Sequence, residues 1–289
     1  MRVGVTNIEK VIRIGRQLYL ATLDCFVEGA PRADEVINGV IGEVVLGGDG
    51  FKLEQLAQRI AVEVRERQGA LRAEATIAVR YPEHKPAPVS GIATQEIYTL
   101  FGAAVASARG TRRLIGVAAQ GMSACPCAQR LVAARSRERL VADGFGDDAI
   151  AAIFEAVPVE THDQRGLGTL HLGLPEGCDT EVDAAELLAI VEDSMSSEIY
   201  ELMKRSDESA VVEKAHRRPR SVQDCVDEAI RGALERYGHL RDDAFLSSRQ
   251  ENLESLHQHT VVAERFGLLA ELRGERVARY TTLREWLNG

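Results

Sequence analysis

The hydrophobic pattern of this chain switches between the two-residue period of strands and the longer period of helices, and this mixture constrains the fold more than any other feature. Residues 73–81 carry apolar side chains at alternate positions and predict a strand. Residues 51–67 carry them at helical spacing and predict an amphipathic helix. The mixture returns later, with a strand expected over 167–174 and a helix over 184–205. We therefore expect an α+β fold in which two similar halves pack together.

Shorter patterns predict the remaining elements. A segment rich in Val, Ile and Gly predicts a strand over 36–46, and the prolines of 82–88 predict a loop. Ser221, followed by Asp224 three residues later, predicts the N-cap of a helix. The other expected strands are 97–106, 113–119, 244–248 and 260–272, and the other expected helices are 128–141 and 147–154.

Charge and composition exclude several classes of protein. The chain has 35 Lys and Arg against 44 Asp and Glu, a formal net charge of −9, which disfavours sequence-independent binding to nucleic acid. Its first residues lack the apolar core of a signal peptide, and no apolar run approaches the roughly 20 residues that span a bilayer. The five cysteines are too scattered for a disulfide framework. We expect a cytoplasmic protein without nucleic-acid or membrane partners.

Two polar motifs contain groups that bind metals or attack electrophiles. In Cys125-Pro126-Cys127 the proline fixes the backbone between two thiols, which suits metal binding or nucleophilic chemistry. An ordinary buried cysteine pair and a redox dithiol remain alternatives. His162 lies in a polar segment, 161–166, directly before an expected strand. It is a candidate metal ligand or proton shuttle, although loop-capping histidines are common.

Two further motifs suggest phosphate binding and acid–base chemistry. Residues 204–220 concentrate Lys and Arg in an otherwise acidic chain, next to the helix start at Ser221, and such a cluster favours phosphate unless it is only a solvated connection. His257 and His259 would face the same side of a strand, and on a loop they need have no role. Together, thiols, imidazoles, carboxylates and cations are the groups needed for metal-assisted hydrolysis of a phosphorylated substrate.

Six segments in this chain resemble the prokaryotic metal-dependent GTP cyclohydrolases of type IB, most closely their archaeal MptA branch. They follow the family's order from near the start of the chain to residue 265. They are VGVTNIEK (3–10), APVSGIATQEIY (87–98), GMSACPCAQ (121–129), THDQRGLG (161–168), DSMSSEIYELMKRSDESAVVEKAH (193–216) and QENLESLHQHTVVAER (250–265).

The resemblance implies a tunnelling fold of paired ββααββ units, whose sheets form a barrel in a homo-oligomer, expected to be a tetramer. It implies one bimodular chain, with a first half over 1–120 and a second half over 121–289 that holds most of the motifs. It also implies the reaction: GTP loses C8 as formate, and the ring is rebuilt as a dihydroneopterin with a triphosphate or cyclic phosphate, for folate or methanopterin biosynthesis.

The family's functional residues can be carried onto matching positions. Cys125, His162 and Glu208 match the metal ligands, which leaves a coordination position for a water that would attack C8. The resemblance implies one divalent metal per subunit, either zinc, iron(II) or manganese. Cys127 matches a second, catalytically important thiol. The remaining matches are His257 and His259 as acid–base groups, and Lys204, Arg205, Lys214 and Arg165 as triphosphate contacts.

Two positions depart from the family pattern. Gln223 stands where the family has the glutamate that anchors guanine, and an amide would face one guanine N–H with its own N–H. The segment 29–34 reads GAPRAD where relatives carry Gly-x-His-Met-Ser-Arg. These departures leave as alternatives an enzyme of the same mechanism acting on another purine nucleotide, such as a xanthine nucleotide, and a non-catalytic pterin- or nucleotide-binding paralogue. A redox protein using Cys125 and Cys127 would explain none of the other motifs.

Overall fold

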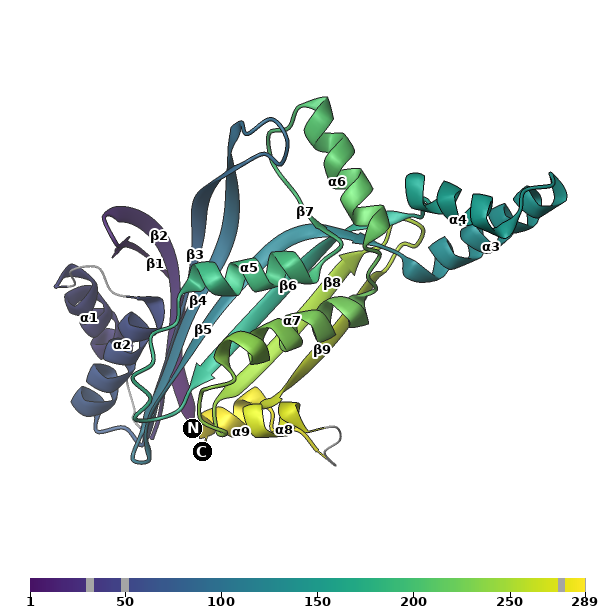
Figure 1. Cartoon of the computed structure of the whole chain (residues 1–289). Coiled ribbons are helices and arrows are strands. Elements are labelled where there is room, and N and C mark those ends of the chain that lie inside the picture. The colour runs from purple at the N-terminus through teal and green to yellow at the C-terminus, as the bar shows by residue number, and fades with distance from the viewer. Residues whose placement is uncertain (30–33, 48–51, 275–278, 289) are drawn as a thin grey trace.

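A single antiparallel sheet forms the centre of the molecule (Figure 1). The computed structural model describes residues 1–29, 34–47, 52–274 and 279–288. The strand order is β1-β2-β3-β4-β5-β6-β8-β9, and the short β7 pairs with β5. The strands are β1 (Arg2–Ile14), β2 (Gln17–Glu28), β3 (Arg72–Pro86), β4 (Ala93–Ser107), β5 (Gly110–Ala124), β6 (Asp163–Leu174), β7 (Ser197–Glu198), β8 (Phe245–Leu253) and β9 (Thr260–Leu268).

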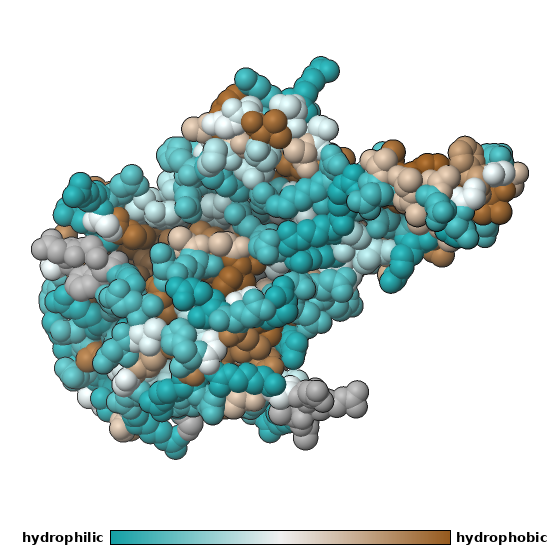
Figure 2. Space-filling model, viewed as in Figure 1, coloured by the Kyte–Doolittle hydropathy of each residue, from teal (hydrophilic) through white to brown (hydrophobic). Residues whose placement is uncertain are grey.

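The helices lie mostly on one face of this sheet (Figure 1). They are α1 (Asp34–Leu46), α2 (Leu53–Gln68), α3 (Pro126–Ala142), α4 (Asp147–Ala156), α5 (Ala184–Ser194), α6 (Arg205–Arg217), α7 (Val222–Tyr237), α8 (Leu269–Arg273) and α9 (Leu283–Asn288). Of these, α2, α5 and α7 pack against the sheet. Helices α3 and α4 project from it (Figure 1) and have hydrophobic side chains at their surface (Figure 2). Among the described helices, none is long and apolar enough to cross a bilayer.

The order of elements contains the ββααββ unit twice, as the resemblance implied. The first unit is β1-β2-α1-α2-β3-β4. The second is β5-β6-α5-α7-β8-β9, with α3 and α4 inserted after β5 and with β7 and α6 inserted after α5. The expected division at residue 120 falls inside β5, and the two units meet at the tight turn from Ser107 to Gly110.

The main core lies between the sheet and its helices. Leu100, Val117 and Leu170 are neighbours across β4, β5 and β6 and are all buried on the helical face. Full burial of such a side chain contributes roughly 1.5–3 kcal/mol. A small second core on the opposite face joins Phe245 and Trp286.

Two predictions in the first unit are wrong. Residues 36–46 form helix α1 rather than a strand, because the buried side chains Ile37, Val40, Ile41 and Val44 recur at helical spacing despite their β-branched character. The predicted loop over 82–88 is largely strand, since β3 continues to Pro86. Its prolines are tolerated because β2 pairs with β3 only as far as Val79, which leaves that edge without a ladder partner.

Two predictions in the second unit are wrong in extent. The helix predicted over 184–205 ends at Ser194, because the next residues turn into β7, which pairs with β5. The strand predicted over 260–272 ends at Leu268, where helix α8 begins. The Glu271 carboxylate accepts the Leu268 N–H at 2.8 Å and so satisfies a free donor of that helix start.

Candidate active site

The Cys-Pro-Cys motif and the segment 161–166 meet at one end of the sheet. Ala124 ends β5 directly opposite Asp163, which begins β6. The Cys125 N–H donates to the His162 carbonyl at 3.1 Å, and the Thr161 hydroxyl donates to the Cys125 carbonyl at 3.0 Å. Strand register therefore places Cys125 and His162 next to one another, although an αα-hairpin separates them along the chain.

The two thiols of the Cys-Pro-Cys motif have different surroundings. Cys125 is the half-buried N-cap of α3, and Pro126 takes the first helical position, where its missing N–H costs nothing. Cys127 is exposed, and the Arg130 guanidinium donates to its Sγ at 3.4 Å. Cys127 is therefore the more accessible of the two thiols.

The start of α7 lies beside Cys125. The Arg220 N–H donates to the Ala124 carbonyl at 2.9 Å, one residue before the thiol. Ser221 and Asp224 then form a reciprocal capping box, which confirms the predicted N-cap. Gln223 is exposed in the first turn of α7, three residues after Arg220, whose N–H makes this contact.

The two histidines of the His-x-His motif lie on a loop rather than a strand. His257 and His259 are exposed between β8 and β9, and their rings stack with centroids 5.0 Å apart. The same loop carries Ser255, whose hydroxyl lies 3.5 Å from Nδ1 of His162. The loop therefore reaches His162 of the Cys125–His162 pair. The rings of His257 and His259 are nearly parallel, as on one side of a strand, although the segment is a loop.

Glu208 does not join Cys125 and His162 within the chain. The far end of α6 contacts this region, since Nε2 of His216 lies 3.2 Å from the Thr161 carbonyl. Glu208 precedes His216 by eight residues, about 12 Å along the helix axis. Within the described ranges, no three His, Cys, Asp or Glu side chains lie close enough to hold a metal together. Of the three expected metal ligands, Cys125 and His162 are therefore adjacent, and Glu208 is distant from both.

The candidate phosphate contacts are spread along α6 and β6. Arg205 and Glu208 line one groove of about 440 Å³ between α6 and residues 156–160. Lys204 is the exposed N-cap of α6, and Arg165 is exposed on β6. Lys214 donates to the Glu198 carboxylate. Burial alone would raise the pKa of Glu198, but hydrogen bonds from Lys214 and Tyr200 outweigh it and hold that pKa below its ordinary value.

A buried aspartate fixes the start of α6. Asp207 is fully buried, and its carboxylate accepts the N–H groups of Val89 and Ser90 at 2.8 and 2.7 Å, the Ser90 hydroxyl at 2.7 Å and the Lys204 N–H at 2.8 Å. Burial opposes ionisation, but these donors prevail and hold the pKa of Asp207 well below its usual range. Asp207 thereby ties the β3–β4 connection to the helix that carries Arg205 and Glu208.

A buried chain of amides and hydroxyls supports the strand ends under the site. The Gln250 amide donates to Asn252 at 2.9 Å, the Asn252 amide donates to Ser123 at 3.0 Å, and the Ser123 hydroxyl donates to the Arg220 carbonyl at 2.6 Å. Asn252 pairs with Gly166, and a side chain at that glycine would collide with the two amides. The glycines of the 161–168 motif therefore make room for this network.

Sequence reasoning missed Asp207 and the polar network. Ser248, Gln250 and Asn252 occupy alternate, inward positions of β8, where apolar residues are expected. That regular placement of polar residues on a buried face was a usable signal. Asp207 offered no such signal, because its partners at Val89 and Ser90 are distant in the sequence.

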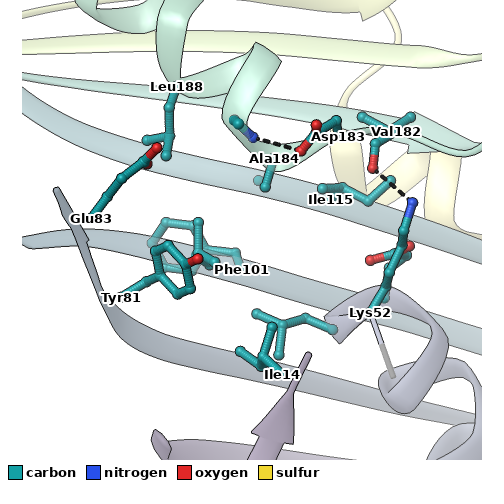
Figure 3. Close-up of a pocket in the computed structure, with 15 residues that line it drawn as sticks. Ile14, Lys52, Tyr81, Glu83, Phe101, Ile115, Val182, Asp183, Ala184 and Leu188 are labelled. Carbon is teal, nitrogen blue, oxygen red and sulfur yellow. Dashed lines mark hydrogen bonds between the residues drawn. The ribbon is translucent and has the colours of Figure 1, made fainter. Parts of the chain in front are cut away.

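A separate cavity of about 230 Å³ lies away from these motifs (Figure 3). Tyr81, Phe101 and Ile115 line it, beside the starts of α2 and α5. Its polar groups serve local structure: the Asp183 carboxylate accepts the Ala185 N–H at 3.0 Å, and the Lys52 ammonium donates to the Val182 carbonyl at 3.3 Å. None of the candidate site residues lines this cavity.

Comparison with known proteins adds independent information. A family model described as type I GTP cyclohydrolase folE2 matches residues 1–263. The chain is 35% identical to GTP cyclohydrolase MptA of Methanococcus aeolicus, over 95% of this chain and 94% of that protein. It is 36% identical to the MptA of Methanosarcina acetivorans and 34% identical to that of Methanocaldococcus jannaschii, with 95% of this chain and 92% of each relative covered.

Two uricases are among the solved structures that this chain resembles. The uricase of Arthrobacter globiformis superposes with a TM-score of 0.59 at 10% identity, covering 97% of this chain and 96% of that one. The uricase of Bacillus fastidious gives 0.52 at 11% identity, covering 98% and 99%. At such low identity these likenesses describe the fold alone, and they agree with the expected tunnelling fold.

Proposed function

The chain belongs to the type I GTP cyclohydrolase family and is an enzyme, and we propose that it opens the purine ring of GTP by hydrolysis at C8. C8 leaves as formate, and the ring closes again as a dihydroneopterin with a phosphorylated side chain. That side chain is either a linear triphosphate or a cyclic phosphate, which differ in mass.

One observation supports this proposal more than any other. Four segments that are distant in sequence reach one end of the sheet: Cys125, the residues before β6, the start of α7 and the β8–β9 loop. These segments supply a thiol, imidazoles and a polar helix start beside one another. Such a set provides both acid–base groups and a binding surface for a nucleotide.

We propose that Cys125 and His162 hold one divalent metal per subunit. A hydrogen bond joins the backbones of these two residues, and their thiolate and imidazole are suitable ligands for zinc, iron(II) or manganese. A cation bound there would supply a Lewis acid and a water of lowered pKa. Glu208 is exposed in a surface groove, so we propose that it completes the ligand set from a neighbouring copy of the chain.

The remaining site residues take roles in proton transfer and binding. Cys127 and one of the loop histidines, His257 or His259, transfer protons to and from the opened ring. Lys204 and Arg205 contact the triphosphate at the exposed start of α6, and Arg165 adds a contact from β6. Lys214 also contributes, and for this it exchanges its present partner Glu198 for phosphate.

A homo-oligomeric barrel, expected to be a tetramer, is part of this proposal. The sheet is open, with β1 and β9 as its two edge strands. Edge strands present unpaired backbone groups that another chain can extend. Exposed apolar side chains also lie on these outer strands or beside them, such as Val11, Leu20 and Val262.

A second candidate function is favoured by Gln223. Guanine presents two N–H donors where the family's glutamate would accept both, and a glutamine can accept only one. A base with an acceptor at C2, such as xanthine, would pair better with an amide. The alternative is therefore the same hydrolysis on XTP.

The test is a turnover assay on the full chain. The protein is reconstituted anaerobically with iron(II), manganese or zinc and incubated with GTP, XTP or ITP, while formate, pterin fluorescence and product mass are followed. Formate from GTP supports the main proposal, and formate from XTP alone supports the second candidate. No formate from any nucleotide with any of the three metals would refute both.

A further inference from the structure

The hairpin formed by α3 and α4 stands away from the body of the molecule (Figure 1). Helix α3 has 17 residues, so it extends about 25 Å. None of those residues, all of which the structure describes, is buried, and in α4 only Ile150 is. Two helices in water gain little stability without tertiary packing, and this hairpin contacts the body mainly at its base, where Gln129 donates to the His216 carbonyl and Arg217 to the Glu155 carbonyl.

The hairpin exposes several large apolar side chains. Ala133, Leu140 and Phe154 are half-buried. Leu131 is 68% exposed and Val141 53% exposed, ten residues apart along α3, and Phe145 is 46% exposed in the turn. Figure 2 shows hydrophobic side chains over this projection. Exposed large apolar side chains gathered on one projecting element are typical of an interaction site.

The two helices carry opposite charge. Helix α3 contains four arginines and one glutamate, whereas α4 contains two aspartates, one glutamate and no cation. Arg137 and Asp147 already pair across the hairpin. A second hairpin related by a twofold axis parallel to the helices would place its α4 against this α3 and its α3 against this α4, so both new contacts would be attractive.

We propose that the α3–α4 hairpin is a self-association element, which packs against the same hairpin of a second copy of this chain as an antiparallel four-helix bundle. The bundle buries Leu131 and Val141 of both copies and pairs the basic helix of each with the acidic helix of the other. Because Cys125 caps α3 and residues 157–161 lead from α4 to His162, the bundle also links the candidate sites of two copies. This contact is separate from the sheet-edge barrel proposed above.

Charge reversal tests the pairing directly. One variant carries Arg135→Glu and Arg139→Glu, which makes α3 acidic, and the other carries Asp148→Lys and Glu155→Lys, which makes α4 basic. All four side chains are exposed, and none belongs to the Arg137–Asp147 pair. Each variant alone then brings like charges together in a homotypic bundle, whereas a mixed pair restores both attractive contacts.

The measurement is the assembly mass of the full chain by sedimentation velocity over a range of concentrations. We expect each charge-reversed variant alone to have half the wild-type mass and a one-to-one mixture to regain the wild-type mass. Variant masses equal to wild type, or a mixture no heavier than its components, would overturn the proposal. Circular dichroism spectra identical to wild type establish that each variant is folded.

A second comparison tests the exposed apolar side chains of α3. Leu131→Glu should halve the mass, whereas Leu46→Glu, at an 89% exposed position on α1, should not. Equal effects of the two substitutions would contradict a specific role for the hairpin.

Discussion

The substitution Asp207→Asn should loosen the contact between the β3–β4 connection and α6. In the wild type one carboxylate oxygen accepts the N–H groups of Val89 and Ser90, and the other accepts the Ser90 hydroxyl and the Lys204 N–H. An asparagine keeps one acceptor oxygen and turns its NH₂ group towards the Lys204 N–H. The Ser90 hydroxyl can rotate to accept, but the Lys204 donor cannot.

The expected cost is about 2–4 kcal/mol, from one lost charge-assisted hydrogen bond and one buried donor left unpaired. The cost falls on local opening of the contact, so it should accelerate hydrogen exchange of the Val89, Ser90 and Lys204 amides by about thirty- to several-hundred-fold. Ser90→Ala is the matched control: it keeps the carboxylate and loses one of the four bonds, so the two other amides should accelerate by about tenfold or less. Unchanged exchange in Asp207→Asn would refute the reasoning.

Three further predictions address His171, Gln223 and the close approach of α5 to Gly168. Burial lowers the pKa of His171 to about 4, so below pH 6.5 the unfolded chain binds a proton that the folded chain does not, and the free energy of unfolding falls as the pH falls. His171→Phe should remove about 2–3 kcal/mol of this decrease in the free energy of unfolding between pH 7 and 4.5, measured by urea unfolding. A decrease as large as in the wild type would contradict this. Gln223→Glu should raise kcat/KM for GTP about tenfold or more, and an equal or lower value would count against the proposed anchoring. Gly168→Ala should lower the free energy of unfolding by about 1–3 kcal/mol in thermal unfolding, because its Cβ would lie 2.7 Å from Cγ1 of Val191. Gly42→Ala, at a helical position with no neighbour near the added Cβ, should not destabilise the protein. Equal effects of the two substitutions would show that the close approach is unimportant.

Local chemistry was sufficient to predict several elements. The alternation in residues 73–81 and 167–174 identified β3 and β6, and the Ser221–Asp224 pair identified the start of α7. Residues 36–46 were wrongly predicted as a strand because their Val and Ile content favours a strand whereas the spacing of their apolar residues favours a helix. Burial by the sheet favoured the periodicity, and the segment is helical.

The site was predictable only in part, since its geometry depends on long-range register. Motif resemblance selected Cys125 and His162, but their proximity follows from the pairing of Ala124 with Asp163 across the αα-hairpin. The distance of Glu208 from this pair follows from α6 being fixed at its start by Asp207 and at its end by His216. No local pattern encodes either contact.

X-ray absorption at the metal edge of the purified, reconstituted enzyme tests the central claim, that Cys125 and His162 hold a catalytic metal. The account predicts one sulfur and at least one imidazole nitrogen in the coordination shell, at about 2.3 and 2.0–2.1 Å for zinc. It also predicts that Cys125→Ser removes the sulfur while Cys25→Ser, at a buried position on β2, does not. A shell without sulfur in the wild type, or a sulfur that persists in Cys125→Ser, would contradict the account.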